Sequence, residues 1–323
     1  MNLRKTSSLT QSELAIQIER LVNAIERTDR PAFDIGQSSS GQERVHNTRL
    51  ARYFGGIQQM FDLFDDRTIY TYSEHLQTFW LACQDIGLER GPAGLTCLND
   101  ERTMYLDFER AMNALVAKIR QLTRSKWYQR KASDRRYEAG KKQTVITDYV
   151  NRVLERYSRT VVVRVDLHYL TGAHARLRIE HVFKDLDGLI RARERDPIFQ
   201  HETGYICSVE QGDARGYHVH AAFFFNGAEV RSDFYKAQQI GELWEQLTAG
   251  RGYYYSCNAE KDQYGDEVGI GTIKRDDIQA RTKVVKAMHY LTKDTQYLHL
   301  KPARAKAFRT GCIRRSLLEN FTG

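Results

Sequence analysis

The chain has 323 residues with a formal net charge of +8, and 41% of them are apolar. This length favours two domains, and the lack of any run of about 18 apolar residues excludes a membrane-spanning helix. The basic surplus favours a polyanionic partner, nucleic acid before a membrane surface. The amino-terminal segment lacks the apolar core of a signal peptide, and the five cysteines form no Cys-x-x-Cys pair, so we expect a cytoplasmic protein with reduced thiols.

The first half of the chain has the periodicity of helices. Thr10 and Glu13 have the spacing of a capping box at the start of the first one. Gly87 can end the second, while the polar segment 35–44 between them has the composition of a loop. Apolar residues at helical spacing predict helices over residues 10–27, 73–87, about 105–127 and about 145–157. Residues 1–157 are therefore expected to form a mostly helical accessory region.

A basic stretch, residues 118–142, lies between the last two of these helices and contains interleaved aromatic residues. Neutralising phosphates and stacking bases on aromatic rings is how proteins hold single-stranded nucleic acid. A solvated helix face would have the same composition. We expect weak nucleic-acid contacts here from Arg124, Lys126, Trp127, Arg130, Lys131, Arg135 and Arg136.

Near residue 158 the pattern changes from helical to alternating. Alternation predicts strands over 160–170, 204–212 and 216–225, and helical spacing predicts helices over 181–196, 232–250 and about 277–297. The turn between the second and third strands is short, which favours an antiparallel hairpin. The fold class is therefore α+β, a helical half followed by a domain, residues 158–323, whose sheet is largely antiparallel.

Two histidines, His218 and His220, lie two residues apart in the third expected strand and so point to the same side of it. If the chain reverses at 212–216, Glu210 lies across from them. One carboxylate and two imidazoles can hold Mg²⁺, Mn²⁺ or another divalent ion and leave positions for water or substrate. Paired strand histidines also serve as plain hydrogen-bond donors, and Glu210 alone reads as a turn carboxylate, so both interpretations stay open at this point.

The last expected helix carries Tyr290 and Lys293, three residues apart, with Tyr297 seven residues after Tyr290. These positions share one helix face. A phenol beside lysine and opposite a metal is suited to nucleophilic attack on a phosphate, because its free pKa near 10 requires assistance. Taken alone, the pattern is equally that of a half-buried tyrosine with a solvated lysine.

The order of these features resembles that of HUH endonucleases, and in particular of rolling-circle replication initiators. Across residues 160–312 the chain resembles the replication-protein family of filamentous phages (inoviruses), which also occurs in prophages; "RVDLHY" and "AFRTGCIRRS" add to the resemblance. The resemblance implies a central antiparallel sheet flanked by helices. It also implies nicking and joining of single-stranded or origin DNA with Mg²⁺ or Mn²⁺, and host helicase and polymerase as partners.

Carried over by position, the resemblance implies that Glu210, His218 and His220 are metal ligands. Tyr290 would attack a DNA phosphate and stay joined to the 5′ end, with Lys293 assisting. Tyr297 has no assured counterpart and is interpreted as a packing residue. Asp166 and His168 fall in the first motif strand, whose role in that family is structural, and are left outside the catalytic set.

Three other interpretations compete. A cupin matches the His-x-His pair, but its motif requires a glutamate where Phe224 and Phe225 stand. A non-catalytic DNA-binding regulator on the same fold is the main alternative, and the intact set of candidate residues argues against it. A relaxase usually places its tyrosine before the histidines, and the small transposases that share the present order are usually much shorter.

Overall fold

The computed structural model describes residues 9–64, 68–92, 94–292 and 297–312. The chain divides into two compact units, the first made of residues 1–135 and 299–303 and the second of residues 136–298 and 304–323. The division falls within helix α5 (Lys126–Glu155), whereas the change of sequence pattern suggested a boundary at 157/158. Each unit has its own buried core.

Three helices pack together in the first unit: α1 (Gln11–Glu26), α3 (Glu74–Asp85) and α4 (Phe108–Thr123). The capping box of α1 is formed, since the Thr10 hydroxyl accepts from the Glu13 backbone and the Glu13 carboxylate accepts from the Thr10 backbone. Gly87 follows α3 with φ of 62°, the left-handed conformation that ends helices. A 3₁₀ turn η1 (Ala51–Gly56) and the short helix α2 (Ile57–Asp62) complete the helical part.

The first unit also contains three two-stranded sheets that helical periodicity did not reveal. They pair β1 (Phe33–Gln37) with β2 (Glu43–Asn47), β4 (Glu89–Gly91) with β5 (Gly94–Thr96), and β3 (Tyr70–Tyr72) with β11 (Leu300–Pro302). The expected loop at 35–44 is therefore a hairpin, with only its tip irregular. Strands this short and exposed have little apolar alternation, so their sequence looks like a loop.

Helix α5 extends the helix expected at 145–157 back through most of the basic stretch, whereas the helix expected at 105–127 is present as α4. α5 is continuous over 30 residues, and α4 ends before it at Thr123. The basic stretch does not interrupt the helix because lysine, arginine, glutamate, glutamine and alanine are all good helix formers. Residues 129–145 of α5 are mostly exposed, which explains why their sequence has no apolar stripe.

The second unit is built on a six-stranded sheet in the order β10-β6-β8-β7-β12, with β9 also paired to β6. Every pairing is antiparallel. The strands are β6 (Arg159–Tyr169), β7 (Glu202–Gly212), β8 (Gly216–Asn226), β9 (Gly252–Ser256), β10 (Gly271–Lys274) and β12 (Phe308–Thr310). β7 and β8 form the expected hairpin, in which Gly216 adopts a positive φ of 60°.

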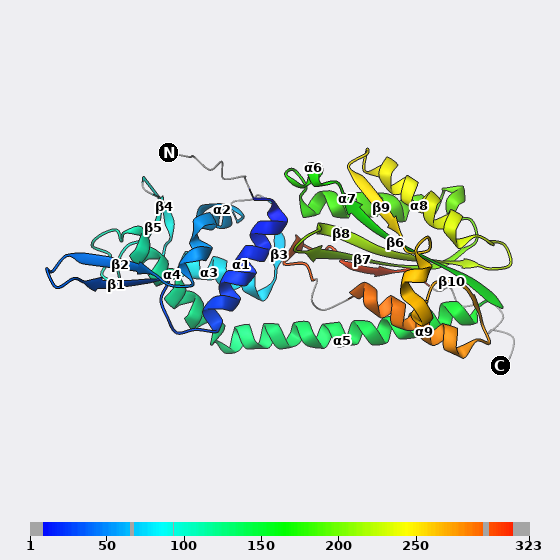
Figure 1. Ribbon diagram of the computed structural model, residues 1–323, viewed down its shortest axis with the longest axis horizontal. Helices are drawn as coiled ribbons and strands as arrows, with labels where there is room; N and C mark the ends of the chain where they lie inside the picture. The colour runs from blue at the N-terminus through cyan, green and yellow to red at the C-terminus, as the bar shows by residue number, and fades with distance from the viewer. Residues whose placement is uncertain (1–8, 65–67, 93, 293–296, 313–323) are drawn as a thin grey trace. The chain divides into compact units, whose positions relative to one another are not determined.

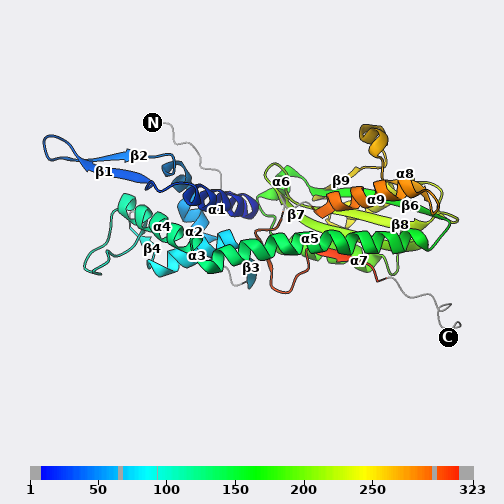
Figure 2. The same cartoon turned by 90° about the horizontal axis from the view of Figure 1, so that it is seen from below.

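Helices cover both faces of this sheet (Figure 1). α7 (Ile179–Ala192) and α8 (Asp233–Leu247) lie on one face, whereas α9 (Ile278–His289) and the carboxyl-terminal part of α5 lie on the other (Figure 2). The remaining short elements are α6 (Thr171–His174), η2 (Pro197–Phe199), η3 (Lys261–Glu267) and η4 (Tyr290–Thr292). The α+β class and the antiparallel sheet flanked by helices are thus confirmed.

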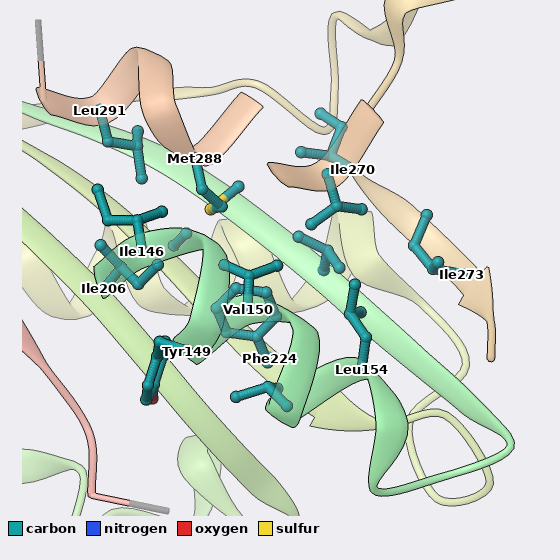
Figure 3. Packing of buried hydrophobic residues seen from close by; sticks show 14 of the residues in the cluster. Ile146, Tyr149, Val150, Leu154, Ile206, Phe224, Ile270, Ile273, Met288 and Leu291 are labelled. Carbon is teal, nitrogen blue, oxygen red and sulfur yellow. The ribbon is translucent and has the colours of Figure 1, made fainter. Parts of the chain in front are cut away.

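A hydrophobic core fills the space between the sheet, α5 and α9 (Figure 3). It joins Val150 of α5 and Met288 of α9 to Phe224 of β8, all fully buried. Because both faces of the sheet are covered, even the polar positions of β6 are buried, including Arg164 and Asp166. Phe234, in the first turn of α8, is 53% exposed and lies outside this core.

Candidate metal centre

The β7–β8 hairpin brings the three expected ligands together. Glu210 lies directly opposite His218 in the ladder, and His220 follows on the same face of β8. One ligand atom from each of the three lies within 4.8 Å of the others, and all three side chains are buried. Within the described residues, these three side chains form a cluster of histidine and carboxylate groups that could hold a metal ion.

Hydrogen bonds orient both imidazoles toward the carboxylate. Nδ1 of His218 donates to the carbonyl of Gly216 at 3.1 Å, and Nδ1 of His220 donates to Asp166 Oδ1 at 2.7 Å. A carbonyl and an ionised carboxylate can only accept, so each Nδ1 carries the proton. The Nε2 atoms then face Oε2 of Glu210, at 3.9 Å from His218 and 3.3 Å from His220.

Glu210 supplies the test of whether a metal fits. Neither of its buried oxygens has a hydrogen bond with adequate geometry to any described residue. A buried carboxylate whose oxygens lack well-aligned hydrogen bonds costs free energy and is rare unless a ligand or water satisfies it. Two Nε2 atoms and one carboxylate oxygen aimed at a common point match a divalent ion that keeps open positions. The hydrogen bond from His220 to Asp166 is the outer contact that metal-ligating histidines usually make.

The electrostatics of the metal-free site point the same way. Burial, reinforced by the charge of His220, lowers the pKa of His218 to about 3. Burial also acts to lower the pKa of His220, but the Asp166 and Glu210 carboxylates outweigh it and raise the pKa to about 9. Burial raises the pKa of Glu210. The site therefore holds one positive charge between two carboxylates, a position that a divalent cation can take.

Asp166 is a site residue that the sequence interpretation left out. It lies opposite His220 across the β6–β8 ladder, and its hydrogen bond with His220 outweighs burial and lowers its pKa to about 2. His168, two residues on, stacks against His218 with ring centroids 5.5 Å apart. Burial, with a further contribution from Arg215, lowers the pKa of His168 to about 4. In the sequence, the alternation of β6 already placed Asp166 and His168 on the same face of the strand, and this was the one sign that they could act together.

Tyr290 is linked to this centre through one arginine. The guanidinium of Arg164 lies over the Tyr290 ring, 5.1 Å from its centroid, and Nη2 of Arg164 lies 3.5 Å from Asp166 Oδ1. Arg164 is buried, whereas Tyr290 is 48% exposed. A continuous series of contacts therefore runs from the exposed phenol through Arg164 and Asp166 to the candidate ligand His220.

Helix α9, which was expected to carry Tyr290, is shorter than expected. α9 ends at His289, and Tyr290 begins the 3₁₀ turn η4. The predicted end of this helix, near residue 297, is therefore wrong. Lys293 lies outside the described residues. Tyr297 is half-buried and belongs to no helix, so the helix-face relationship expected between it and Tyr290 is absent.

The basic residues of α4 and α5 fall into two groups. Arg124 and Arg135 form ion pairs, with Asp29 and with the buried Glu74, the latter at 2.8 Å. Lys126, Arg130, Lys131 and Arg136 are exposed, and Trp127 is half-buried. The exposed members lie on α5, where they can meet phosphates. None of the helices within the described ranges is long and apolar enough to cross a bilayer.

The fold and the site together define a mixed helix–sheet protein with a Glu-His-His candidate metal centre on a central antiparallel sheet. The model of the YagK/YfjJ C-terminal domain matches residues 119–301, more than half of the chain. The chain therefore belongs to this family, which is found in prophage-like elements. No curated protein and no solved structure matches the chain.

Proposed function

We propose that this protein is a metal-dependent enzyme that nicks and rejoins single-stranded DNA, of the HUH endonuclease kind, and that it starts rolling-circle replication of a prophage-like element. The convergence of Glu210 Oε2 with the Nε2 atoms of His218 and His220 carries the proposal, because it places one carboxylate and two imidazoles of buried side chains around a common point. Membership in a family of prophage-like elements agrees with it. A cytoplasmic location and partnership with a host helicase and polymerase belong to the same proposal.

In the proposed reaction Tyr290 is the nucleophile. Its Oη forms a bond to the DNA phosphorus, and the bond from phosphorus to the 3′ oxygen breaks. The phenol proton ends on the leaving oxygen, which gives a free 3′ hydroxyl and a 5′-phosphotyrosine. Attack by a 3′ hydroxyl on that ester reverses the exchange and rejoins the strand.

The surrounding side chains hold the reactants. When bound, Mg²⁺ or Mn²⁺ polarises the phosphate and offsets its charge. His218 and His220 keep their Nε2 atoms turned inward because their Nδ1 protons are engaged. Arg164 fixes the Tyr290 ring from below through its guanidinium face. We assign Lys293, three residues after Tyr290, the role of stabilising the negative charge that develops during attack on the phosphate.

The exposed basic side chains of α5 are proposed to hold the flanking strand. Four of them lie between residues 126 and 136 of the helix. Each phosphate contact displaces a counterion, so binding should weaken as salt rises. If the protein binds single-stranded DNA with equal affinity at about 50 mM and about 200 mM salt, this part of the proposal is wrong.

An adduct assay tests the proposal. Purified protein is mixed with a pooled random single-stranded DNA library and Mn²⁺ or Mg²⁺, then denatured and separated by electrophoresis. We expect a protein–DNA band that requires metal, survives denaturation, and disappears in Tyr290→Phe and in His218→Ala. DNA binding without any band, on the library and on duplex DNA of the host element alike, would favour the non-catalytic regulator.

A further inference from the structure

Strand β9 presents two tyrosines on the face of the sheet that carries the metal ligands. In the β6–β9 ladder Tyr253 lies opposite His168 and Tyr255 opposite Asp166. Paired residues of a ladder point to the same face. Tyr254, between them, points the other way and lies directly against Gly241 of α8. The alternation therefore leaves two phenol rings on the face of the site and one against α8.

Both rings are accessible. Tyr253 is 38% exposed and Tyr255 is 37% exposed. Among the described strands none pairs with the outer edge of β9, so no neighbouring strand covers them. The Tyr255 hydroxyl donates to Gln263 at 3.3 Å, which orients the ring and leaves its face uncovered by that contact.

The two rings are continuous with the candidate centre. Tyr253 stacks on His168 with centroids 5.1 Å apart and an interplanar angle of 27°. His168 stacks in turn on the ligand His218 at 5.5 Å. Arg215, exposed in the turn between the two ligand strands, adds a positive charge near His168. Stacked rings with an adjacent cation suit an unpaired base and its phosphate.

We propose that Tyr253 and Tyr255 form a stacking platform for nucleobases of single-stranded DNA next to the phosphate that is cleaved. The platform rests on the proposed function for the presence of DNA at the centre. It adds a reason for selectivity, because the bases of a duplex already stack on one another and cannot lie on a protein ring. Bases beside the scissile phosphate would thereby fix which phosphate reaches Tyr290.

The test measures the affinity for a short labelled single strand by fluorescence anisotropy, with EDTA present so that no cleavage occurs. Replacing either ring, as Tyr253→Ala or Tyr255→Ala, should weaken binding roughly 5-fold to 150-fold for each base that stacks. Tyr253→Phe and Tyr255→Phe keep the ring and should stay within about 2-fold of wild type. Tyr235→Ala removes a 56% exposed tyrosine on α8 and is the matched control, expected to change nothing.

A second ligand makes the test independent of how the variants fold. On wild-type protein, a strand with abasic positions in place of the stacked bases should lose affinity to the same extent. The double variant Tyr253→Ala/Tyr255→Ala should then bind abasic and normal strands equally. Duplex affinity, which rests on phosphates, should be the same for the alanine variants and wild type.

Unchanged single-strand affinity in both alanine variants, or equal losses for single strand and duplex, would overturn the platform. The nicking proposal fails differently. If wild type forms no metal-dependent adduct yet still loses single-strand affinity on Tyr253→Ala, the platform remains and the enzyme assignment falls.

Discussion

Glu210→Gln should make the metal-free protein slightly more stable and yet remove the stabilisation that metal provides. Burial raises the pKa of Glu210, so its ionised form is disfavoured in the folded state at pH 7. A raised pKa for a carboxyl group means that folding stability is lost as the pH rises above the unfolded value. A neutral amide of the same shape avoids this cost, and we expect a small gain in stability in EDTA.

With metal the order of stabilities should reverse. An ion that binds only the folded state adds about 2.7 kcal/mol at a concentration 100 times its dissociation constant. For a unit of this size that corresponds to an increase in Tm of roughly 5–10 °C. Glu210→Gln loses one of the three ligands and the negative charge of the centre, so its Tm should change little on adding the same Mn²⁺.

The assay is thermal unfolding in EDTA and in excess Mn²⁺, with Asp276→Asn as control because Asp276 is an exposed carboxylate away from the centre. Because the chain has two compact units, only the transition that responds to metal in wild type is compared. The reasoning is refuted if wild type gains nothing from any divalent ion, or if Glu210→Gln gains as much as wild type.

Three other predictions concern the same unit. Asp166→Asn weakens the hydrogen bond that orients His220, so metal affinity measured by calorimetry should fall about 10-fold to 100-fold. An unchanged affinity would contradict the role given to Asp166. Because the pKa of His220 is about 9 without metal, binding at pH 7 must displace its proton. Affinity should then rise about tenfold per pH unit from pH 7 and level off near pH 9, and a flat profile would count against ligation by His220. Phe224→Ala should cost about 3–5 kcal/mol in urea unfolding, because its ring is fully buried between the sheet and α5 and α9. Phe234→Ala, at an exposed ring, should cost less than about 0.5 kcal/mol, and similar losses for the two variants would refute this assignment of the core.

Features that depend on a short stretch of chain were predictable. The β7–β8 hairpin needed only alternation and a glycine-rich turn, so Glu210, His218 and His220 could be brought together from sequence. The capping box of α1 was equally local. Such signals rest on neighbouring residues and on the strand and helix periods, which sequence displays directly.

Features that depend on distant pairing were not predictable. Asp166 enters the site only because β6 pairs with β8 in a register that sets it against His220, and no local signal gives that register. The contact between Arg164 and Tyr290 requires α9 to end above β6. The hairpins of the first unit and the continuity of α5 were missed because their exposed residues lack apolar periodicity.

The most direct test of the central claim is to identify the residue that becomes joined to DNA. The adduct is digested with nuclease and trypsin, and the nucleotide-bearing peptide is sequenced by mass spectrometry. Trypsin separates the two tyrosines, because Tyr290 falls in the peptide AMHYLTK and Tyr297 in DTQYLHLKPAR. We predict a 5′-phosphate remnant on Tyr290 that forms only with a divalent metal. A remnant on Tyr297, or on any residue in Tyr290→Phe, would contradict the assigned nucleophile, and a metal-independent adduct would contradict the role of the Glu-His-His centre.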